Sequence, residues 1–367
     1  MARLVNPSPD FWRGKRVMVT GHSGFKGAWL MLWLEALGAR PFGYSLAPDT
    51  EPSLACLLGV NERFESVTAD IRNIQDLTNA VARFRPDIIF HLAAQALVRR
   101  SYHQPVETFA TNLMGTVNIL NAATEEPSVK AIVVVTTDKC YENREWLWPY
   151  REDEALGGVD PYSASKACAE IATSAWRRSL SSLTGVRERK AGLAIATARA
   201  GNVIGGGDWA DDRLVPDCVR ALSAGKSIVV RSPSSTRPWQ HVLEPLCGYL
   251  ILAQLLIEKR ANVEAAWNFG PPIDDVKPVS WVVDRIVSLW GRDARWETTG
   301  EPQPHEASLL AVDASKARAH LGWKPRLKLA EALRWTVDWY TSHRDGATTT
   351  NLVRDQINAY EHLPLEI

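Results

Sequence analysis

Short apolar segments alternate with longer amphipathic segments along the first half of the chain. The apolar segments are rich in β-branched residues, which is typical of buried strands. We expect strands over residues 16–19, 40–44, 63–68, 86–94, 129–135 and 193–199. Helices are expected between them, for example over 28–37 and 105–124. This alternation predicts an α/β fold with a Rossmann-type, doubly wound parallel sheet.

The alternation weakens after residue 200, so we expect two parts. Residues 11–200 are predicted to form the Rossmann domain, and residues 201–345 a smaller mixed α/β region interleaved with it. In that region a short strand is expected over 227–231, with helices from residue 213 and over 244–257, 279–290, 315–321 and 329–343. Residues 346–367 are polar and are expected to form a tail that is partly disordered.

A glycine-rich turn joins the first predicted strand to its helix. Gly21 permits a tight turn, Gly24 lets a pyrophosphate approach the backbone, and Gly27 lets helix and strand pack closely. The helix N-terminus then offers free N–H groups to phosphates. Three spaced glycines alone can be only a tight turn, but the flanking strand and helix favour dinucleotide binding.

The second strand ends in Gly43-Tyr44-Ser45, without the acidic residue that usually holds the adenosine ribose. No arginine or lysine follows closely to hold a 2′-phosphate, so NAD is favoured over NADP. Ser45 is a candidate partner for a ribose hydroxyl. Asp70 follows the third strand, where it either caps the helix that starts near Ile74 or bonds the adenine amino group.

Polar side chains follow the fifth strand, where the ligand crevice of an open parallel sheet is expected. Thr137, Asp138 and Lys139 emerge there together, although an Asp-Lys pair can also be an ordinary surface ion pair. A helix then opens with Tyr162 and Lys166, which share one face because they are four residues apart. We expect Lys166 to lower the pKa of the Tyr162 phenol, which would make that phenol a workable base for a sugar hydroxyl.

The bulk composition narrows the function classes. The chain has 42 basic and 42 acidic residues, and this balance favours neither nucleic acid nor a membrane surface as a partner. The longest apolar run, residues 246–257, is too short to span a bilayer. Five scattered cysteines and a first segment without an apolar core lead us to expect reduced thiols in the cytoplasm. The eight histidines form no metal-ligand pair, so no metal is expected.

These motifs resemble the extended short-chain dehydrogenase/reductase superfamily, from residue 11 to about residue 340. The glycine turn, Asp70, Thr137 and the Tyr162-x-x-x-Lys166 pair carry that resemblance. Within it, the chain is most similar to the sugar-nucleotide 4,6-dehydratase branch, and to those of its members that act on CDP-D-glucose. The segments that carry this closer likeness are residues 20–27, 135–141, 201–209 and 237–242.

The resemblance implies an enzyme that keeps NAD tightly bound and converts CDP-D-glucose to CDP-4-keto-6-deoxy-D-glucose. The sugar is oxidised at C4, water is eliminated across C5 and C6, and a hydride returns to C6. The alternatives are a sugar-nucleotide 4-epimerase, or a dehydratase of a dTDP, UDP or GDP sugar. A further alternative is a non-catalytic NAD(H)-binding sensor. Asp138 and Lys139 argue against an epimerase, because epimerisation needs no acid and base at C5 and C6.

The resemblance also implies residue roles. Tyr162 takes the proton of the sugar 4-hydroxyl, Thr137 bonds O4, and Lys166 binds the nicotinamide ribose. Asp138 is then the acid at O6, and Lys139 is the base at C5, where the dTDP branch carries glutamate. Besides the three glycines, Tyr162 and Lys166, the implied cofactor contacts are Ser23, Phe25, Lys26, Ser45, Asp70, Ile71, Leu92, Ala93, Ala94, Thr136 and Val203.

The implied substrate contacts lie mostly in the second region. They are Gln95, Asn202, Arg213, Leu214, Arg231, Arg237 and His305. The arginines suit a diphosphate, because guanidinium groups bind phosphate oxygens in pairs. An arginine that relatives carry just before His305 is absent here. A homodimer is also implied, in which the helices around 105–124 and 162–180 form a four-helix interface.

Overall fold

The computed structural model describes residues 6–182, 192–259, 261–291, 293–299 and 308–364. Within these residues the central sheet has seven parallel strands in the order β11-β6-β5-β4-β1-β2-β3. The strands are β1 (Arg16–Thr20), β2 (Arg40–Ser45), β3 (Ser66–Thr68), β4 (Ile88–His91), β5 (Ala131–Val135), β6 (Ala194–Ala200) and β11 (Ala266–Phe269). The strand order reverses beside β1, so the predicted doubly wound sheet is confirmed.

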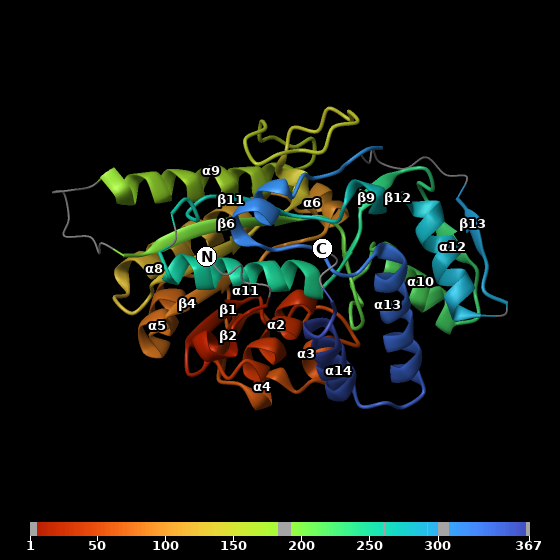
Figure 1. Ribbon diagram of the computed structural model, residues 1–367, viewed down its shortest axis with the longest axis horizontal. Helices are drawn as coiled ribbons and strands as arrows, with labels where there is room; N and C mark the ends of the chain where they lie inside the picture. The colour runs from red at the N-terminus through yellow and green to blue at the C-terminus, as the bar shows by residue number, and fades with distance from the viewer. Residues whose placement is uncertain (1–5, 183–191, 260, 292, 300–307, 365–367) are drawn as a thin grey trace.

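Helices cover both faces of this sheet (Figure 1). The helices of the Rossmann part and the helix that follows β10 are α1 (Pro9–Trp12), α2 (Phe25–Ala36), α3 (Leu54–Leu57), α4 (Val60–Arg63), α5 (Ile74–Phe84), α6 (Val98–His103), α7 (Pro105–Phe109), η1 (Ala110–Met114), α8 (Gly115–Glu125), η2 (Asp138–Cys140), α9 (Pro161–Ser182) and α11 (Leu243–Ile257). Alternate residues of β1 point to opposite faces, so Val17 and Val19 join the core with α2 and α11, whereas Met18 joins the core with α5 and α8.

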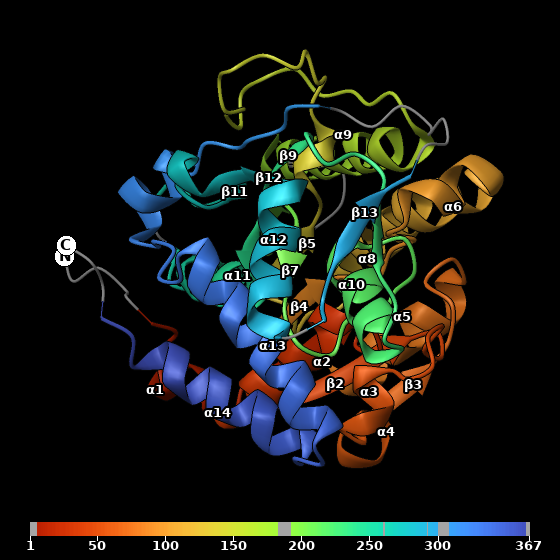
Figure 2. The same ribbon diagram turned by 90° about the vertical axis from the view of Figure 1, so that its right-hand side faces the viewer.

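A second region gathers at one end of the sheet, at the right of Figure 1 and facing the viewer in Figure 2. Its elements are β7 (Val203–Ile204), α10 (Leu214–Ser223), β8 (Ile228–Val230), β9 (Thr236–Pro238), β10 (Gln240–His241), η3 (Ile273–Asp275), β12 (Val276–Pro278), α12 (Val279–Trp290), β13 (Trp296–Thr298) and α13 (Leu329–Arg344). The short helix η4 (Ala317–Leu321) packs on α11 and β11 instead. Short strand pairs β7–β10, β9–β12 and β8–β13 hold this region together. The second region therefore lies at the carboxyl ends of the sheet strands.

The prediction of a polar, partly disordered tail was wrong for most of that segment. Residues Thr349–Glu361 form α14, with Val353, Ile357 and Tyr360 buried at helical spacing. Tyr360 donates to the buried carboxylate of Glu244 at 2.8 Å. The segment is polar on its outer face only, so its low mean hydropathy concealed an amphipathic helix.

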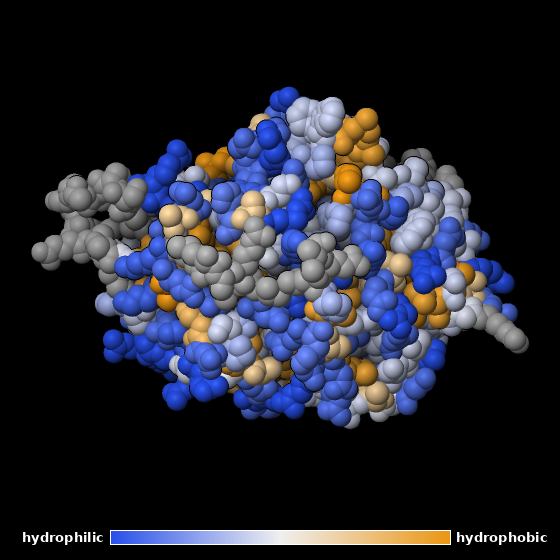
Figure 3. All heavy atoms as spheres, in the orientation of Figure 1, coloured by the Kyte–Doolittle hydropathy of each residue, from blue (hydrophilic) through white to orange (hydrophobic). Residues whose placement is uncertain are grey.

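Two predicted strands are also shorter than expected. Arg63 belongs to α4 rather than to β3, and β4 ends at His91, so Leu92 to Ala94 form the loop after it. None of the described helices is both long and apolar enough to cross a membrane. The face in Figure 3 is mainly hydrophilic. Leu147 and Trp148, in the segment that follows η2, are exposed.

Candidate active site

The turn between β1 and α2 has the shape that its glycines predict. Gly21 has φ 76°, and a Cβ atom added to it would lie 2.7 Å from the Ala93 nitrogen. A Cβ atom added to Gly27 would lie 2.1 Å from the Gly21 carbonyl oxygen. At Gly24, by contrast, the nearest atom would be 3.4 Å away, and this residue is exposed. Two glycines are therefore needed for packing, and the third leaves an open side toward a ligand.

The first turn of α2 is suited to an anion. Its N-cap is Gly24, which supplies no side-chain hydrogen bond to the helix N–H groups. Such N–H groups, together with the positive end of the helix dipole, bind phosphate. Lys26 lies in this turn, and burial together with the charges of Arg213 and Lys166 lowers its pKa to about 7. The geometry therefore fits the pyrophosphate of a dinucleotide.

Ser45 lies where the missing acidic residue of β2 would lie. It is buried, donates to the Ser23 hydroxyl at 2.8 Å, and is 3.0 Å from the Nδ1 atom of His22. The Nε2 atom of His22 is 2.9 Å from the Asn61 side-chain oxygen. A neutral network thus takes the place of a carboxylate at the expected ribose position.

Asp70 does not cap the following helix, so that alternative is wrong. The N-cap of α5 is Asn73, whose side chain accepts from the Gln75 and Asp76 nitrogens. Asp70 instead pairs with Arg72 at 2.5 Å, and hydrogen bonds from Arg72 lower the Asp70 pKa. The adenine alternative stays a prediction.

The polar residues after β5 are brought together as predicted. The Thr137 hydroxyl donates to Asp138 Oδ1 at 3.1 Å, and it accepts from the Lys139 nitrogen at 3.3 Å as the N-cap of η2. Asp138 is 1% exposed, and its Oδ2 atom has no hydrogen-bond partner among the described residues. The Lys139 amine is 3.8 Å from Asp138 Oδ1 and is 29% exposed. A buried carboxylate with one unpaired oxygen thus lies beside a more accessible amine just after β5.

Tyr162 and Lys166 lie in the first turns of α9, and Asp160 caps that helix by accepting from the Ser163 nitrogen and hydroxyl. The Lys166 amine donates to the Val135 carbonyl oxygen at 3.2 Å, which ties α9 to the end of β5. Thr137 also lies close enough to Tyr162 to favour the ionised form of its phenol. The predicted tyrosine, lysine and threonine therefore meet at one point.

The charge state of this tyrosine differs from the expectation. Burial raises the pKa of Tyr162 to about 12; the neighbouring Thr137 opposes this, and the charge of Asp138 adds to it. Burial also lowers the pKa of Lys166 to about 8, although the charge of Glu170 opposes that shift. The predicted lowering of the phenol pKa was wrong, because the loss of solvation outweighs the opposing charge of Arg213.

The structure adds a buried ion pair that the sequence did not predict. Glu170 and Arg199 are each 3% exposed and lie 2.8 Å apart. Glu170 also accepts hydrogen bonds from the hydroxyls of Thr136 and Thr197. Arg199 donates to the Tyr141 hydroxyl at 2.8 Å, so the pair connects α9, β5, β6 and the segment after η2. A sequence signal existed, since Glu170 is four residues after Lys166 on the same helix face.

The remaining predicted cofactor contacts line the same edge of the sheet. Ile71 is buried against Gly115, and Leu92 and Ala93 lie under Gly21. Ala94 and Val203 are half-buried. Thr136 is buried, and its hydroxyl donates a hydrogen bond to the Glu170 carboxylate.

The predicted substrate contacts differ from one another in burial and in their bonding partners. Gln95 is buried and donates to the Thr108 hydroxyl at 3.0 Å, whereas the Asn202 side-chain oxygen is buried with no partner among the described residues. Arg213 pairs with Asp208 at 2.8 Å beside the half-buried Leu214. Arg237 is buried and donates to the Thr236 carbonyl oxygen, and Arg231 pairs with Asp212. His305 lies outside the described residues.

A model of the NAD dependent epimerase/dehydratase family matches residues 17–263. The chain belongs to this family. It is 49% identical to the CDP-glucose 4,6-dehydratase of Salmonella typhimurium over 351 residues, which cover 96% of this chain and 97% of the relative. The dTDP-glucose 4,6-dehydratase 1 of Escherichia coli is 26% identical, over 89% of this chain and 93% of its own.

Solved structures of the same fold include both epimerases and dehydratases. The UDP-glucose 4-epimerase of Thermotoga maritima with UDP-glucose has a TM-score of 0.76 and 21% identity, over 90% of this chain and 99% of its own. The dTDP-glucose 4,6-dehydratase of Bacillus anthracis in complex with NAD has a TM-score of 0.73 and 21% identity, over 92% and 100%. The resemblance and the Rossmann fold predicted from the sequence are confirmed, and the cofactor of this epimerase/dehydratase is NAD.

Proposed function

We propose that the protein converts CDP-D-glucose to CDP-4-keto-6-deoxy-D-glucose. The observation that carries this proposal is the buried Asp138, whose free oxygen lies beside the Thr137–Tyr162 pair. A C4 oxidation site needs only the threonine, tyrosine and lysine, whereas elimination of water also needs an acid at O6. The 49% identity to a CDP-glucose 4,6-dehydratase supports the same reaction and the same nucleotide.

The chain's own groups then divide the proton transfers. Bound NAD supplies the redox chemistry by taking a hydride from C4 and returning it to C6. Tyr162, beside Thr137, takes the proton of the 4-hydroxyl, and the resulting ketone acidifies the C5 proton. Lys139 takes the C5 proton, Asp138 gives a proton to O6, and water leaves. Lys139 returns its proton to C5 as C6 is reduced. Tyr162 then holds one proton more and Asp138 one proton fewer than at the start, and proton exchange with solvent restores both groups before the next turnover.

The reaction is tested by incubating the protein with CDP-, dTDP-, UDP- and GDP-glucose and following mass. We expect the loss of one water from CDP-glucose, with no net reduction of NAD. A product of unchanged mass with inverted C4 would instead identify a 4-epimerase. Loss of water from another nucleotide sugar alone would contradict the assignment of CDP.

Tyr162→Phe separates catalysis from NAD sensing. We expect turnover to fall roughly 100-fold or more, because the base at O4 is lost. Tyr102→Phe, at an exposed tyrosine of α6, is the matched control and should keep full activity. Undiminished turnover by the Tyr162→Phe variant would contradict the proposed catalytic role of Tyr162.

Lys139→Met tests the base at C5. We expect exchange of deuterium from solvent into C5 to be lost, while oxidation at C4 persists in a single turnover. Lys130→Met is the control, because Lys130 is exposed at the opposite end of β5. Exchange at the rate of the unchanged protein would assign the base to another group.

We also propose that the protein works in the cytoplasm as a homodimer. The support for the dimer is that α9 packs beside the continuous helical segment formed by α7, η1 and α8. These two neighbouring segments expose the apolar side chains of Val106, Met114 and Ile171. Sedimentation of Ile171→Glu should show monomers where the unchanged protein shows dimers. The five free cysteines suit a reducing compartment, and fractionation of the native host tests the location.

A further inference from the structure

A cavity of about 530 Å³ lies between α9, β6, β11 and the segment that joins η2 to α9. Alternation along β6 turns Thr197 and Arg199 to the same side, where both donate to Glu170. Along α9, Glu170, Ser174 and Arg177 are spaced by four and three residues, so they line the cavity from one face of the helix. Among the described residues, none predicted for catalysis, cofactor or substrate lines this cavity, which is therefore a second site.

Three basic side chains line the cavity close to one another. They are Arg177 of α9, Arg199 of β6 and Lys316, which directly precedes η4. Burial lowers the pKa of Lys316, and the charges of Arg199 and Arg177 lower it further, so the three groups are near enough to repel one another. Burial lowers the pKa of Arg177 as well, and the charge of Arg199 acts in the same direction. An anion among these groups would relieve the repulsion.

Some hydrogen-bond donors of these groups have no acceptor. Arg199 is 3% exposed and donates through both Nη atoms, but its Nε atom has no partner among the described residues. The Nη1 atom of Arg177 is buried and likewise has no partner there. Lys316 donates to the Ala266 carbonyl oxygen at 2.7 Å, which uses one of its three N–H groups. Buried donors without an acceptor are costly, so the cavity favours a ligand that supplies acceptors.

The acidic residues of the lining do not neutralise these donors. Glu170 is held in the ion pair described above, and the Glu152 carboxylate accepts from a backbone nitrogen of β11 at 2.8 Å. Asp153 and Glu154 lie 3.8 and 3.9 Å from a fourth basic residue of the lining, Arg151. The positive charge left without an ion pair in the described lining is therefore that of the groups on α9 and before η4.

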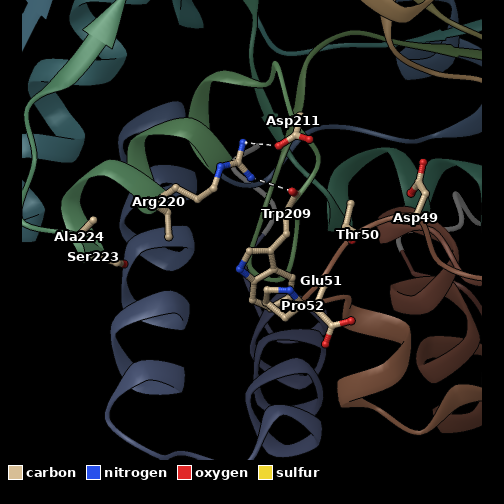
Figure 4. Close-up of a pocket in the computed structure, with 10 residues that line it drawn as sticks. Asp49, Thr50, Glu51, Pro52, Trp209, Asp211, Arg220, Ser223 and Ala224 are labelled. Carbon is tan, nitrogen blue, oxygen red and sulfur yellow. Dashed lines mark hydrogen bonds and ion pairs between the residues drawn. The ribbon is translucent and has the colours of Figure 1, made fainter.

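The pocket in Figure 4 has a comparable size but a different use of its arginine. Arg220 pairs there with Asp211 and Asp217 and donates to the Trp209 carbonyl oxygen. Figure 4 shows its guanidinium group directed at Asp211 and at that carbonyl oxygen. The chain itself thus occupies the donors of Arg220, whereas the cavity beside α9 keeps unpaired donors.

We propose that Arg177, Arg199 and Lys316 form a phosphate-binding site, separate from the active site, for inorganic phosphate or the phosphate group of a small metabolite. Two guanidinium groups and one ammonium group supply the charge-assisted donors that a tetrahedral dianion accepts. The Ser174 hydroxyl on the same wall is a further donor. The cavity is larger than a phosphate ion alone, so it also admits an attached organic group. A phosphate held there joins α9 to β6 and to the segment before η4.

Equilibrium dialysis with radiolabelled inorganic phosphate tests the site directly. Saturating NAD and CDP are present, so that phosphate does not enter the active site. We expect saturable binding with a dissociation constant on the order of 1 mM, and Arg177→Gln should weaken it roughly tenfold. Lys316→Met should have a similar effect. Arg178→Gln is the matched control, because Arg178 is the next residue of α9 but is exposed and lies outside the cavity lining.

Thermal unfolding supplies a second readout, in which each variant is compared with its own phosphate-free sample. With the expected affinity, about 20 mM phosphate should raise the melting temperature by about 2 °C. The rise should fall below about 1 °C in Arg177→Gln and stay complete in Arg178→Gln. Sodium chloride at equal ionic strength measures the general effect of salt, which is subtracted.

Several results would overturn the proposal. They are equal phosphate affinities in Arg177→Gln and the unchanged protein, equal losses in Arg177→Gln and Arg178→Gln, or no saturable binding up to about 20 mM, which would leave water as the acceptor. Competition by glycerol 3-phosphate then separates the two sources of phosphate. Tighter binding than inorganic phosphate would identify a phosphate ester as the occupant, and weaker binding would identify inorganic phosphate.

Discussion

Replacing Glu170 with glutamine keeps the shape of the side chain and removes its charge. In the folded chain this carboxylate accepts from Arg199, Thr136 and Thr197, all in the interior behind the candidate catalytic residues. Glu170→Gln leaves the Arg199 guanidinium group buried without its counter-ion. Breaking a buried pair in this way costs about 3–5 kcal/mol of unfolding free energy.

The expected change in melting temperature follows from the size of the chain. An unfolding entropy of about 2.1 cal/mol/K per residue gives roughly 0.8 kcal/mol/K for this chain, so the melting temperature should fall by about 4–6 °C. Thr197→Val is the control, because it removes one hydrogen bond to Glu170 but leaves the ion pair with Arg199, and it should cost less, about 1.5–3 kcal/mol. Both are measured by thermal unfolding followed by circular dichroism.

The difference in stability between the unchanged protein and Glu170→Gln should depend on pH in one direction. Burial opposes ionisation of Glu170, but Arg199 and the two hydroxyl donors outweigh burial, so the Glu170 pKa is below its usual value of 4.5. A lowered pKa contributes stability that is complete above the unfolded value and is lost as pH falls through the folded value. The gap between the unchanged protein and Glu170→Gln should therefore be full at pH 7 and close below about pH 4.

Activity supplies an independent readout. The charge of Glu170 raises the pKa of Lys166 against the effect of burial, so Glu170→Gln should lower that pKa further. The alkaline limb of the kcat/KM profile should then move to lower pH. A melting temperature within about 1 °C of the unchanged protein, together with an unshifted alkaline limb, would refute the reasoning.

Three further changes test separate parts of the structure. Gly27→Ala places a Cβ atom 2.1 Å from the Gly21 carbonyl oxygen, so calorimetry should show NAD affinity falling roughly 100-fold or more. Lys26 has its pKa lowered to about 7, so NAD affinity should weaken as pH rises through 7, and Lys26→Met should flatten that dependence between pH 6 and 9. Tyr360→Phe removes the buried hydrogen bond to Glu244 and should cost about 1–3 kcal/mol in thermal unfolding. An unchanged NAD affinity in Gly27→Ala, an unchanged pH dependence in Lys26→Met or an unchanged stability in Tyr360→Phe would contradict the corresponding contact.

The sheet and its helices could be predicted because local pattern determines them. Strands such as β5 are short, apolar and β-branched, and the glycines at 21 and 27 have positions that only a tight strand-to-helix turn explains. The helix α14 was not predicted, since a few apolar residues spread among polar ones resemble a tail until α2 and α13 are available to pack against. Its partner Glu244 is more than a hundred residues away in sequence.

The candidate site was predicted where a short spacing carries the geometry. Tyr162 and Lys166 are one helical turn apart, and Asp138 directly follows Thr137. Arg199 could not be assigned to Glu170 from the sequence, because the pair meets only when β6 lies beside β5. The raised pKa of Tyr162 was missed for the same reason, since burial is a property of the assembled fold.

Three cationic side chains, those of Lys26, Lys166 and Arg213, lie close together at the candidate active site. The charges of Arg213 and Lys166 add to burial in lowering the pKa of Lys26, whereas burial lowers the pKa of Lys166 against the charge of Glu170. Asp208 and Asp212 offset part of this charge by pairing with Arg213 and Arg231. A dinucleotide and a nucleoside diphosphate would each bring phosphate charges into this field, so the binding of either should favour the protonated form of Lys26.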